Sequence, residues 1–318
     1  WHLGHLPEFL PPARGFDEYF GIPYSNDMNP PVLLSATAAG VETVEERATM
    51  ETLTPRYTER ALQFIEKNKD QPFFLYMPHT FPHIPLGASA RFRGKSPHGI
   101  YGDVVAELDW SVGQILTALK KHNLDRNTLV LFTSDNGPWF MGSPGHLRGR
   151  KGTTYEGGVR EPFIARMPGR IPAGKVCDGV ASTMDVLPTV AKLTGATLPA
   201  QPLDGIDIGP LLTGQKKELE REALLYFDNV NVQCARLGRY KIHIARYNSA
   251  VYSPAPQGGR VNLPLPQPEL YDLSIDPDES YDIAPEKPEI VKDLQARIER
   301  LVAGFPENIR EAHKATFA

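Results

Sequence analysis

The chain has 318 residues, of which 41% are hydrophobic and 23% charged, with 27 glycines and 30 prolines. This composition is that of a globular protein with one large α/β domain plus an appendage, or with two domains, and it excludes collagen, coiled-coil and disordered chains. The 34 basic and 38 acidic residues leave a net charge of −4, which does not indicate a nucleic-acid partner, and no apolar run approaches the roughly 18 residues of a membrane span.

Extended and helical segments alternate along the first two thirds of the chain. Apolar, β-rich runs bounded by Pro, Asn, Asp or Gly predict strands at 72–78, 128–134 and 162–168. Helical periodicity predicts helices at 56–68, 103–124 and 184–193, the last ended by Gly195. The alternation predicts a mostly parallel sheet flanked by helices, in an α/β domain over residues 1–215.

The helix predicted at 103–124 has the clearest amphipathic pattern. Its apolar residues recur in three- and four-residue steps, which predicts one buried stripe that packs on the sheet. The stripe consists of Val105, Leu108, Val112, Ile115, Leu116 and Leu119.

The pattern changes after the charged run at 216–222. Strands are predicted at 223–228, 234–247 and 269–275, followed by a helix at 289–302. Residues 254–268 contain five prolines and two adjacent glycines, which predicts a long loop between the strands. We therefore expect residues 216–318 to form a small α+β subdomain, an antiparallel sheet with a closing helix.

A hydrophobic segment runs directly into Asp135 and Asn136, in the motif TSDNGP. In open α/β sheets, ligands bind beyond the carboxyl ends of the strands. Gly137 and Pro138 favour a turn there, and only beyond the strand end can two consecutive side chains reach one ion. A carboxylate and an amide oxygen suit calcium or magnesium better than zinc. The motif therefore predicts a cation site, with a simple turn-forming Asx pair as the alternative.

Two histidines, His79 and His83, occupy the proline-rich motif PHTFPHIP just past the strand predicted at 72–78. The prolines exclude a helix, so these histidines do not form the zinc pair of a helical HExxH motif. A loop histidine here can act as an acid or a base, and a structural histidine is the alternative.

Cations and glycines are interspersed in the segment GHLRGRKGTTYEGGVREP at 145–162. Glycines let the backbone approach an anion, and Arg148, Arg150 and Lys151 offer charge-assisted hydrogen bonds to its oxygens. The spacing does not fit the GxxxxGK[ST] phosphate loop, so nucleotide binding is not indicated. A solvated basic loop is the alternative.

Together these three segments suggest one site for hydrolysis of a sulfate or phosphate ester. Such a site needs an oxygen-liganded divalent ion, a lysine that binds the anion, and a histidine that donates a proton to the leaving group.

The same segments resemble the formylglycine-dependent sulfatases of the alkaline-phosphatase superfamily, and most of all the branch of arylsulfatase A and N-acetylgalactosamine-6-sulfatase. The resemblance implies an alkaline-phosphatase-like fold and cleavage of a sulfate monoester by a formylglycine hydrate with one calcium ion. The matching segments, which run almost from end to end, are WHLGH at 1–5, GFDEYFGIPYSND at 15–27, PFFLYMPHTFPH at 72–83, LVLFTSDNGP at 129–138, RKGTTYEGGVREP at 150–162, GRYKIH at 238–243 and ELYDLSIDPDESYD at 269–282.

The resemblance implies roles for four residues of the three segments. Asp135 and Asn136 would be two of the calcium ligands, and Asp135 would also help to activate the hydrate. Lys151 and His83 would contact the sulfate group and the leaving oxygen.

Three further histidines occur in matching segments. The resemblance implies that His2 hydrogen-bonds the formylglycine hydrate and helps to expel sulfate. It implies a place in the substrate pocket for His243, in the YKxH segment, and no role for His79.

The chain contains no formylglycine motif [CS]-x-[PA]-x-R. Cys177 begins CDGVA, Cys234 begins CARLG, and Ser89 begins SARFR. The two cysteines also indicate neither a disulfide framework nor a CxxC site. Because the chain starts inside the family's GKWHLG segment, we expect the formylglycine and the remaining calcium ligands to lie upstream. For residues 1–318 alone we expect little or no sulfatase activity and weak calcium binding.

Two alternatives stay open. The first is a phosphoesterase of the same superfamily, which typically uses two zinc ions held partly by an Asp-His pair, and Asn136 in the place of that His disfavours it. The second is a non-catalytic protein that binds sulfated glycans. For the sulfatase, the expected partner is a sulfated small molecule or glycan, with neither a nucleic acid nor a membrane span. The expected location is periplasmic, lysosomal or extracellular.

Overall fold

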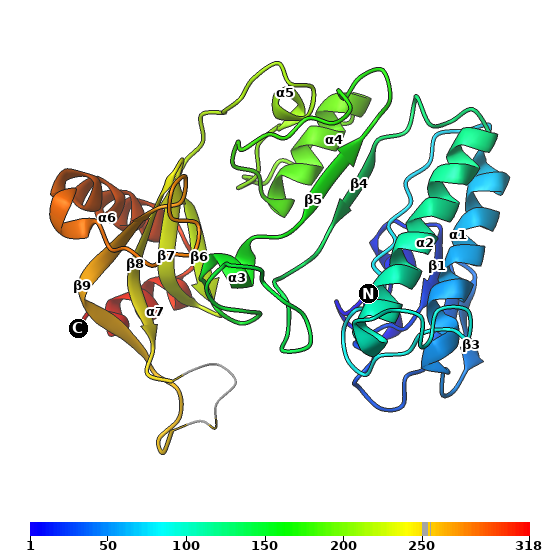
Figure 1. The fold of residues 1–318 in the computed structure, drawn as a ribbon, viewed down its shortest axis with the longest axis horizontal. Coiled ribbons are helices and arrows are strands. Elements are labelled where there is room, and N and C mark those ends of the chain that lie inside the picture. Colours follow the sequence, from blue (N-terminus) through cyan, green and yellow to red (C-terminus); the bar gives the residue numbers. More distant parts are fainter. Residues whose placement is uncertain (250–253, 255) are drawn as a thin grey trace. The chain divides into compact units, whose positions relative to one another are not determined.

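The computed structural model describes every residue except 250–253 and 255. It divides into two compact units, Trp1–Leu129 and Val130–Ala318, whose helices and strands are drawn in Figure 1. The boundary predicted at residue 215 falls inside the second unit and stays a prediction. Residue 255 of the predicted proline loop lies outside the described residues.

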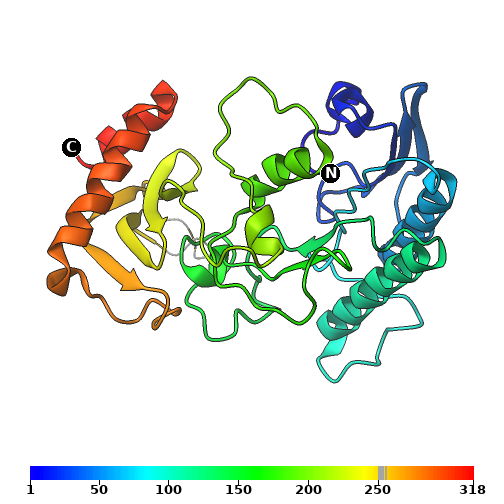
Figure 2. The same cartoon turned by 90° about the horizontal axis from the view of Figure 1, so that it is seen from above.

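The first unit consists of a three-stranded antiparallel meander and two long helices. The strands pair in the order β1-β2-β3. The helices α1 and α2 lie side by side (Figures 1 and 2), and the hydroxyls of Thr58 and Ser111 hydrogen-bond between them at 2.7 Å. The elements are η1 Pro7–Phe9, η2 Pro11–Arg14, β1 Glu18–Gly21, β2 Leu33–Thr37, β3 Gly40–Glu45, η3 Met50–Thr52, α1 Leu53–Asn68 and α2 Gly99–Lys121.

Both predicted helices of this unit are confirmed, with shifted ends. In α1, buried residues recur in three- and four-residue steps, as an amphipathic helix requires. In α2, the predicted stripe is only partly confirmed, because Leu119 is buried but Val105 is 43% exposed, while Val104 and Ser111 are buried. The face that contains Val104 and Ser111 packs on α1 through Ser111 and on a core cluster with Leu33 of β2 through Val104. Periodicity missed it because the hydrogen bond to Thr58 allows the polar Ser111 to be buried.

The strand predicted at 72–78 is wrong, because the segment has no strand in the structure. Phe74 and Tyr76 occupy alternate positions of the segment, as in a strand, but their side chains are 63% and 55% exposed. A strand exists only where a neighbour accepts and donates its backbone hydrogen bonds, and an apolar run does not encode that neighbour.

The first part of the second unit contains one pair of strands and short helices. Gly195, at φ 76°, ends α4 in the left-handed conformation, which confirms the predicted helix end. The elements are β4 Val130–Thr133, α3 Glu156–Val159, β5 Phe163–Arg166, η4 Thr183–Asp185, α4 Val186–Thr194 and α5 Gly209–Leu212.

The strands predicted at 128–134 and 162–168 are confirmed, but the parallel pairing is not. β4 and β5 pair antiparallel, with Val130 opposite Arg166 and Thr133 opposite Phe163. All strand pairs among the described residues are antiparallel. An apolar run favours a strand without specifying its direction, which depends on where the connecting chain crosses.

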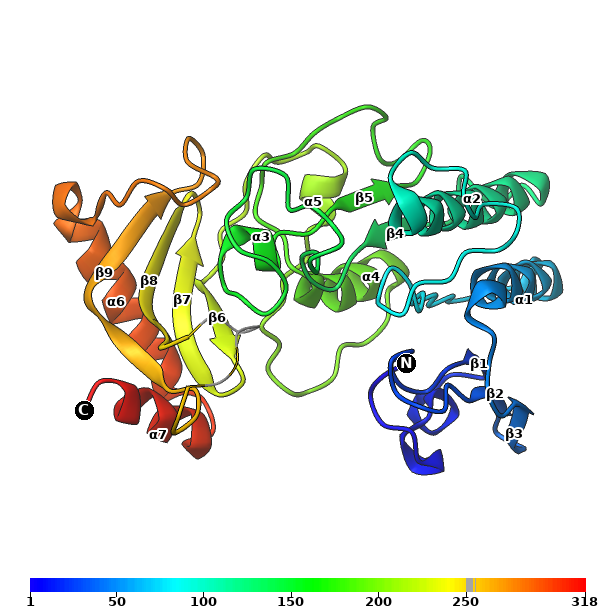
Figure 3. The ribbon, with the colours of Figure 1, turned by 60° about the horizontal axis from the view of Figure 1, so that its bottom comes forward.

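The predicted C-terminal antiparallel sheet with a closing helix is confirmed. Its strands are ordered β6-β7-β8-β9, and α6 lies along one face of the sheet (Figure 3). The segment predicted as one strand at 234–247 is two strands joined at Gly238, whose φ is 55°. The elements are β6 Leu224–Asp228, β7 Asn231–Leu237, β8 Tyr240–Tyr247, β9 Asn262–Asp272, η5 Ala284–Glu286, α6 Pro288–Ala303 and α7 Glu307–Thr316.

The loop predicted at 254–268 is partly wrong, because β9 begins at Asn262. Proline lacks the N–H that a central strand needs, so three prolines at alternate positions argue against a strand by sequence. β9 lies at the edge of the sheet, and the register shifts between Glu269 and Pro264, opposite His243 and Ala245. An edge strand with an irregular register tolerates these prolines.

The C-terminal sheet has one apolar and one polar face, because side chains alternate along each strand. Ala235, Ile242 and Leu270 are neighbours across β7, β8 and β9. They are fully buried in a core that also contains Leu294 and Ile298 of α6. The alternate residues form a polar row on the other face, which contacts α3 and the segment before it. That row consists of Arg236, Lys241 and Tyr271.

Two further features concern the described residues. None of their helices combines the length and the apolar character that crossing a membrane requires. Cys177 is exposed and Cys234 buried, and both are free thiols.

Candidate functional site

His2 lies at the N-terminal end of the first unit, beside the segment that follows β1. Its backbone N–H donates to Pro23 O at 2.9 Å, and the amino group of Trp1 donates to Ile22 O at 3.2 Å. These contacts hold the exposed His2 next to the start of the Tyr24–Asp27 segment.

His83 lies in the proline-rich loop, as predicted, and the same Tyr24–Asp27 segment holds that loop. The side-chain amide of Asn26 donates to the carbonyls of His83 and Pro85, each at 3.0 Å. His83 Nδ1 is 2.6 Å from Ile84 O. Since a carbonyl only accepts, Nδ1 carries the proton, and Nε2 is left for other partners.

Asp27 brings His2 and His83 into one cluster. A hydrogen bond from Ser25 lowers the pKa of the Asp27 carboxyl, and the positive charges that His83 and His2 can carry lower it further. The two histidines therefore both lie near one carboxylate in the first unit. Sequence reasoning did not single out Asp27, although it ends the matched segment GFDEYFGIPYSND and so carried a signal.

His79 is not part of this cluster. Burial lowers its pKa to about 4, and its Nδ1 is buried without a hydrogen-bond partner among the described residues. Its ring lies 6.4 Å from that of Tyr57. These features support the alternative that His79 is a structural histidine.

In the second unit, Asp135 and Asn136 follow β4 in a turn, as predicted. The N–H of Gly137 donates to Gly158 O at 2.9 Å. A Cβ at residue 137 would lie 2.0 Å from Gly157 O, so only glycine fits. The turn therefore sits directly against the glycines of α3.

Glu161 is a carboxylate that sequence reasoning missed. Glu161 lies two residues before Phe163, which pairs with Thr133 at the end of β4, and it is close enough to Asp135 to be affected by its charge. Burial raises the pKa of Glu161 to about 7, and the negative charge of Asp135 adds to the rise. Its Oε1 is buried and has no hydrogen-bond partner among the described residues. The signal was positional, since each carboxylate lies one residue outside a predicted strand, Asp135 after 128–134 and Glu161 before 162–168.

This pair tests whether the segment fits a cation. The nearby carboxylates of Asp135 and Glu161 make ionisation of both groups unfavourable, and Glu161 Oε1 is an acceptor without a hydrogen-bond donor among the described residues. Together with the amide oxygen of Asn136, they are hard oxygen donors, which suit calcium. The residues therefore fit a divalent cation, although calcium takes roughly six to eight oxygens and needs further ligands.

Lys151 belongs to a loop that folds against this turn. Its N–H donates to Pro138 O at 3.2 Å. The guanidinium of Arg150 donates to the carbonyls of Trp139 and Gly142, at 3.1 and 2.7 Å. The half-buried Lys151 is thus fixed by its backbone beside the Asp135 turn. The structure brings these two predicted segments together.

His243 lies elsewhere in the second unit, on the polar face of the C-terminal sheet. It is 2% exposed, and its Nε2 is 2.6 Å from Glu279 Oε1. Burial lowers its pKa, against the opposing effect of Glu279. Its ring stacks on Tyr155, with centroids 4.8 Å apart. The predicted contact of His243 with substrate stays a prediction.

His2 and His83 belong to the first unit, and Asp135, Asn136 and Lys151 belong to the second. That these side chains contact one sulfate group stays a prediction.

Comparison with known proteins gives consistent matches. The sulfatase family model matches residues 1–196, and a second model, described as N-sulphoglucosamine sulphohydrolase, C-terminal, matches residues 149–304. Arylsulfatase A of Homo sapiens is 38% identical over 356 residues, covering 97% of this chain and 70% of its own length. N-acetylgalactosamine-6-sulfatase of Canis lupus familiaris is 39% identical over 264 residues, covering 76% of this chain and 50% of its own length.

A solved structure gives the same picture at the level of the fold. The crystal structure of the PsFucS1 sulfatase from Pseudoalteromonas sp. superposes with a TM-score of 0.82 at 27% identity, covering 94% of this chain and 69% of that one. This likeness confirms the predicted α/β fold class. The chain spans between 50% and 70% of the length of these three proteins.

Proposed function

This chain belongs to the sulfatase family, and from that premise we propose that the full-length protein is a sulfuric ester hydrolase of the arylsulfatase type. Its substrate is a sulfated small molecule or glycan. The observation that carries the proposal is the packing of the Lys151 loop on the Asp135 turn, joined by the Lys151–Pro138 and Gly137–Gly158 hydrogen bonds. This packing supports the proposal, because it brings the backbone of Lys151, the proposed anion contact, beside the hard oxygen donors of the Asp135 turn.

Asp135 and Asn136 would hold one calcium ion. When bound, the ion supplies Lewis-acid polarisation of the sulfate oxygens. Glu161, which lies near Asp135, would add a carboxylate oxygen to this position. Lys151 binds the sulfate group and offsets its charge with hydrogen bonds from the ammonium.

His83 donates a proton to the leaving oxygen. Because Nδ1 is committed to Ile84 O, the transferable proton is the one on Nε2 of the protonated imidazole. The carboxyl of Asp27 lies close to both His83 and His2. His2 would hold a proton at the sulfate that departs from the nucleophile, and His243 would line the substrate side.

The nucleophile of the proposed reaction is a formylglycine hydrate, and residues 1–318 contain no motif for it. It supplies the oxygen that attacks sulfur when present. An exported location also stays a prediction, which fractionation of cells would test.

The test compares hydrolysis of p-nitrophenyl sulfate and p-nitrophenyl phosphate by the full-length protein, with calcium and with EGTA. We expect faster turnover of the sulfate, loss of turnover in EGTA, and recovery with calcium. Phosphate turnover a hundredfold faster than sulfate turnover would instead establish the phosphoesterase. Binding of sulfated glycans without turnover of either ester would establish the non-catalytic alternative.

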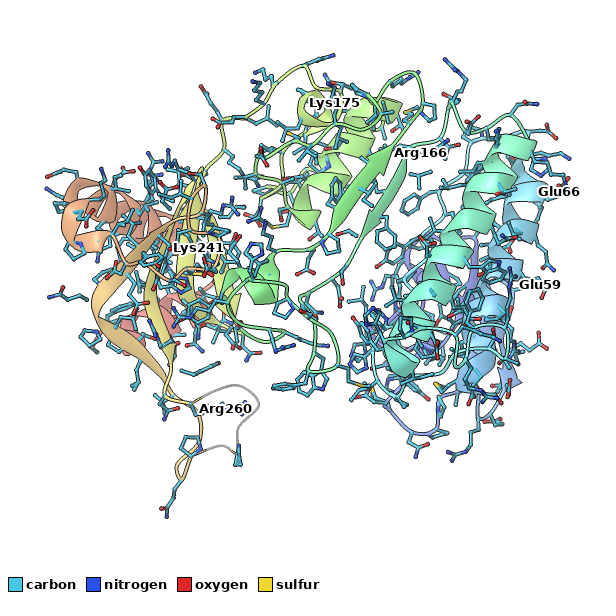
Figure 4. The ribbon with its side chains drawn as sticks, in the orientation of Figure 1. Glu59, Glu66, Arg166, Lys175, Lys241 and Arg260 are labelled. Atoms are coloured by element: carbon cyan, nitrogen blue, oxygen red, sulfur yellow. The ribbon has the colours of Figure 1, made fainter. Side chains whose placement is uncertain are left out.

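Lys151→Met, compared with Lys175→Met, probes the anion contact in the same assay. Lys175 is an exposed lysine of the same unit, away from the Asp135 turn (Figure 4). Removal of one preorganised cation is expected to lower kcat on the order of 100-fold. Lys175→Met should keep the activity of the unchanged protein. Equal activity of the two variants would remove Lys151 from the proposed site.

A further inference from the structure

We propose that Glu279 is a positioning residue, which holds the Lys151 loop in its active shape from the polar face of the C-terminal sheet. This inference rests on the proposed function, since it takes Lys151 as a sulfate contact. It assigns a role to a buried charged group that the reaction itself does not use.

The carboxylate of Glu279 accepts from two groups of the second unit. Its Oε2 accepts the backbone N–H of Glu156 at 2.6 Å, at the first residue of α3. Its Oε1 lies 2.6 Å from His243 Nε2. The Glu279 side chain is fully buried, so neither contact can be replaced by water without rearrangement.

A buried lysine balances the charge of this carboxylate. Lys241, labelled in Figure 4, places its Nζ 2.9 Å from Glu156 Oε1 and 3.2 Å from Glu279 Oε1. Burial would raise the pKa of Glu279, but the hydrogen bond with His243 and the charge of Lys241 outweigh it and lower that pKa. Glu279 is therefore ionised, and its bond to the Glu156 N–H is charge-assisted.

A second connection reaches the other end of the same loop. The guanidinium of Arg148 donates to Glu279 O at 3.0 Å and lies 4.2 Å from the centre of the Tyr155 ring. Tyr155 also stacks on the ring of His243, with centroids 4.8 Å apart. Tyr155 therefore contacts both Arg148 and His243, and each of these two residues also contacts Glu279.

Lys151 lies between the two points that Glu279 holds. Arg148 and Glu156 bracket it by three and five residues, and Gly157 N–H closes the loop by donating to Arg148 O at 2.7 Å. The backbone of Lys151 is fixed to Pro138, next to the Asp135 turn. Freeing Glu156 and Arg148 would therefore loosen Lys151 relative to that turn.

Two observations favour positioning over simple stabilisation of the sheet. The sheet has its own apolar core on the opposite face, built with α6 and without Glu279. Glu279 also adopts φ 54°, a left-handed conformation that is unfavourable for a residue with a side chain and persists where surrounding contacts impose it. Buried charges are costly for stability, so a buried network at this place indicates a geometric role.

The test is Glu279→Gln in the full-length protein, with Asp272→Asn as the matched control. Asp272 is a buried carboxylate of β9 in the same sheet, paired with Arg239 and not with the Lys151 loop. Hydrogen exchange of residues 148–158 is measured together with kcat and KM for p-nitrophenyl sulfate and inhibition by inorganic sulfate.

We expect Glu279→Gln to speed exchange at 148–158 by about tenfold, as for the loss of one charge-assisted hydrogen bond. Because a small misplacement of a catalytic group can cost on the order of 100-fold in rate, kcat should fall, and inorganic sulfate should inhibit more weakly. Exchange in α6 should not change. Asp272→Asn should leave exchange at 148–158 and kcat unchanged.

Unchanged exchange at 148–158 in folded Glu279→Gln would overturn the inference, and so would the same increase in Asp272→Asn. If Glu279→Gln does not fold, the exchange of the Glu156 amide in the unchanged protein decides. Slow exchange there supports the bond to Glu279, and exchange at the rate of unstructured backbone contradicts it. If the unchanged protein does not hydrolyse the aryl sulfate, the proposed function fails, while the exchange data still decide the positioning role.

Discussion

The two histidines of the proline-rich loop, His79 and His83, have different surroundings. His83 has its Nδ1 satisfied by a carbonyl and lies near Asp27, whereas the Nδ1 of His79 is buried without a partner among the described residues. One motif therefore contains one histidine suited to proton transfer and one suited to packing. The difference follows from their neighbours and leads to two predictions.

The first prediction concerns proton donation by His83. His83→Gln should lower kcat for aryl sulfates by about 100-fold or more, because general acid catalysis contributes roughly that much. The loss should be largest for phenols of high pKa, which need the proton most. His98→Gln, at an exposed histidine of the same unit, is the control. A loss that does not depend on the phenol pKa would contradict the acid role.

The second prediction concerns pH. Burial lowers the pKa of His79 from 6.5 to about 4. The unfolded chain therefore binds this proton first as pH falls, so the contribution of His79 is complete above pH 6.5 and is lost between pH 6.5 and 4. The loss should approach about 3 kcal/mol by the relation of 1.36 kcal/mol per pKa unit.

Urea denaturation at several pH values checks this, because His79→Gln should show a smaller decrease in unfolding free energy over the same window. An equal decrease in both proteins would show that His79 titrates normally. Nuclear magnetic resonance of the His79 ring should find it neutral at pH 5.5.

At the scale of elements, the glycines at α2 and α4 show how position decides the effect of one residue type. Gly195 ends α4 at φ 76°, whereas Gly113 lies inside α2, where an added Cβ would have no other atom within 4 Å. A side chain strains the first backbone and favours the second.

Gly195→Ala should therefore lower the unfolding free energy by about 1 kcal/mol, and Gly113→Ala should raise it by about 0.5 to 1 kcal/mol. Denaturant titration followed by hydrogen exchange of α4 and α2 would measure each effect in its own helix. Destabilisation by both substitutions would mean that a neighbour, and not the backbone conformation, limits these sites.

At the scale of the whole molecule, the prediction that His83 and Lys151 contact one sulfate group can be tested directly. Inorganic sulfate, as a product, should slow hydrogen exchange in the His83 loop at 79–86 and in the Lys151 loop at 148–153 at the same time. Inorganic phosphate at equal concentration should protect both segments less, if the site discriminates between the two anions. Protection of only one segment would contradict the proposal that both loops bind one sulfate group.

Elements with local signals could be predicted from the amino-acid sequence alone. The periods of α1 and α6, the end of α4 at Gly195, and the turn after β4 all depend on residues within a few positions of one another. The segments that identify the sulfatase family are also contiguous runs, so the family could be predicted, and so could the packing of the Asp135 turn with the Lys151 loop.

Features that depend on partners far apart in the sequence became apparent only from the fold. It paired β4 with β5 in antiparallel direction, left 72–78 without a strand, and made β9 an edge strand despite its prolines. It also placed Glu161 near Asp135, and the Glu279 carboxylate against the Glu156 N–H, more than 120 residues away in the sequence. The physical reason is that strand pairing and buried charge are satisfied by neighbours in space, and a local pattern carries no record of which neighbour that is.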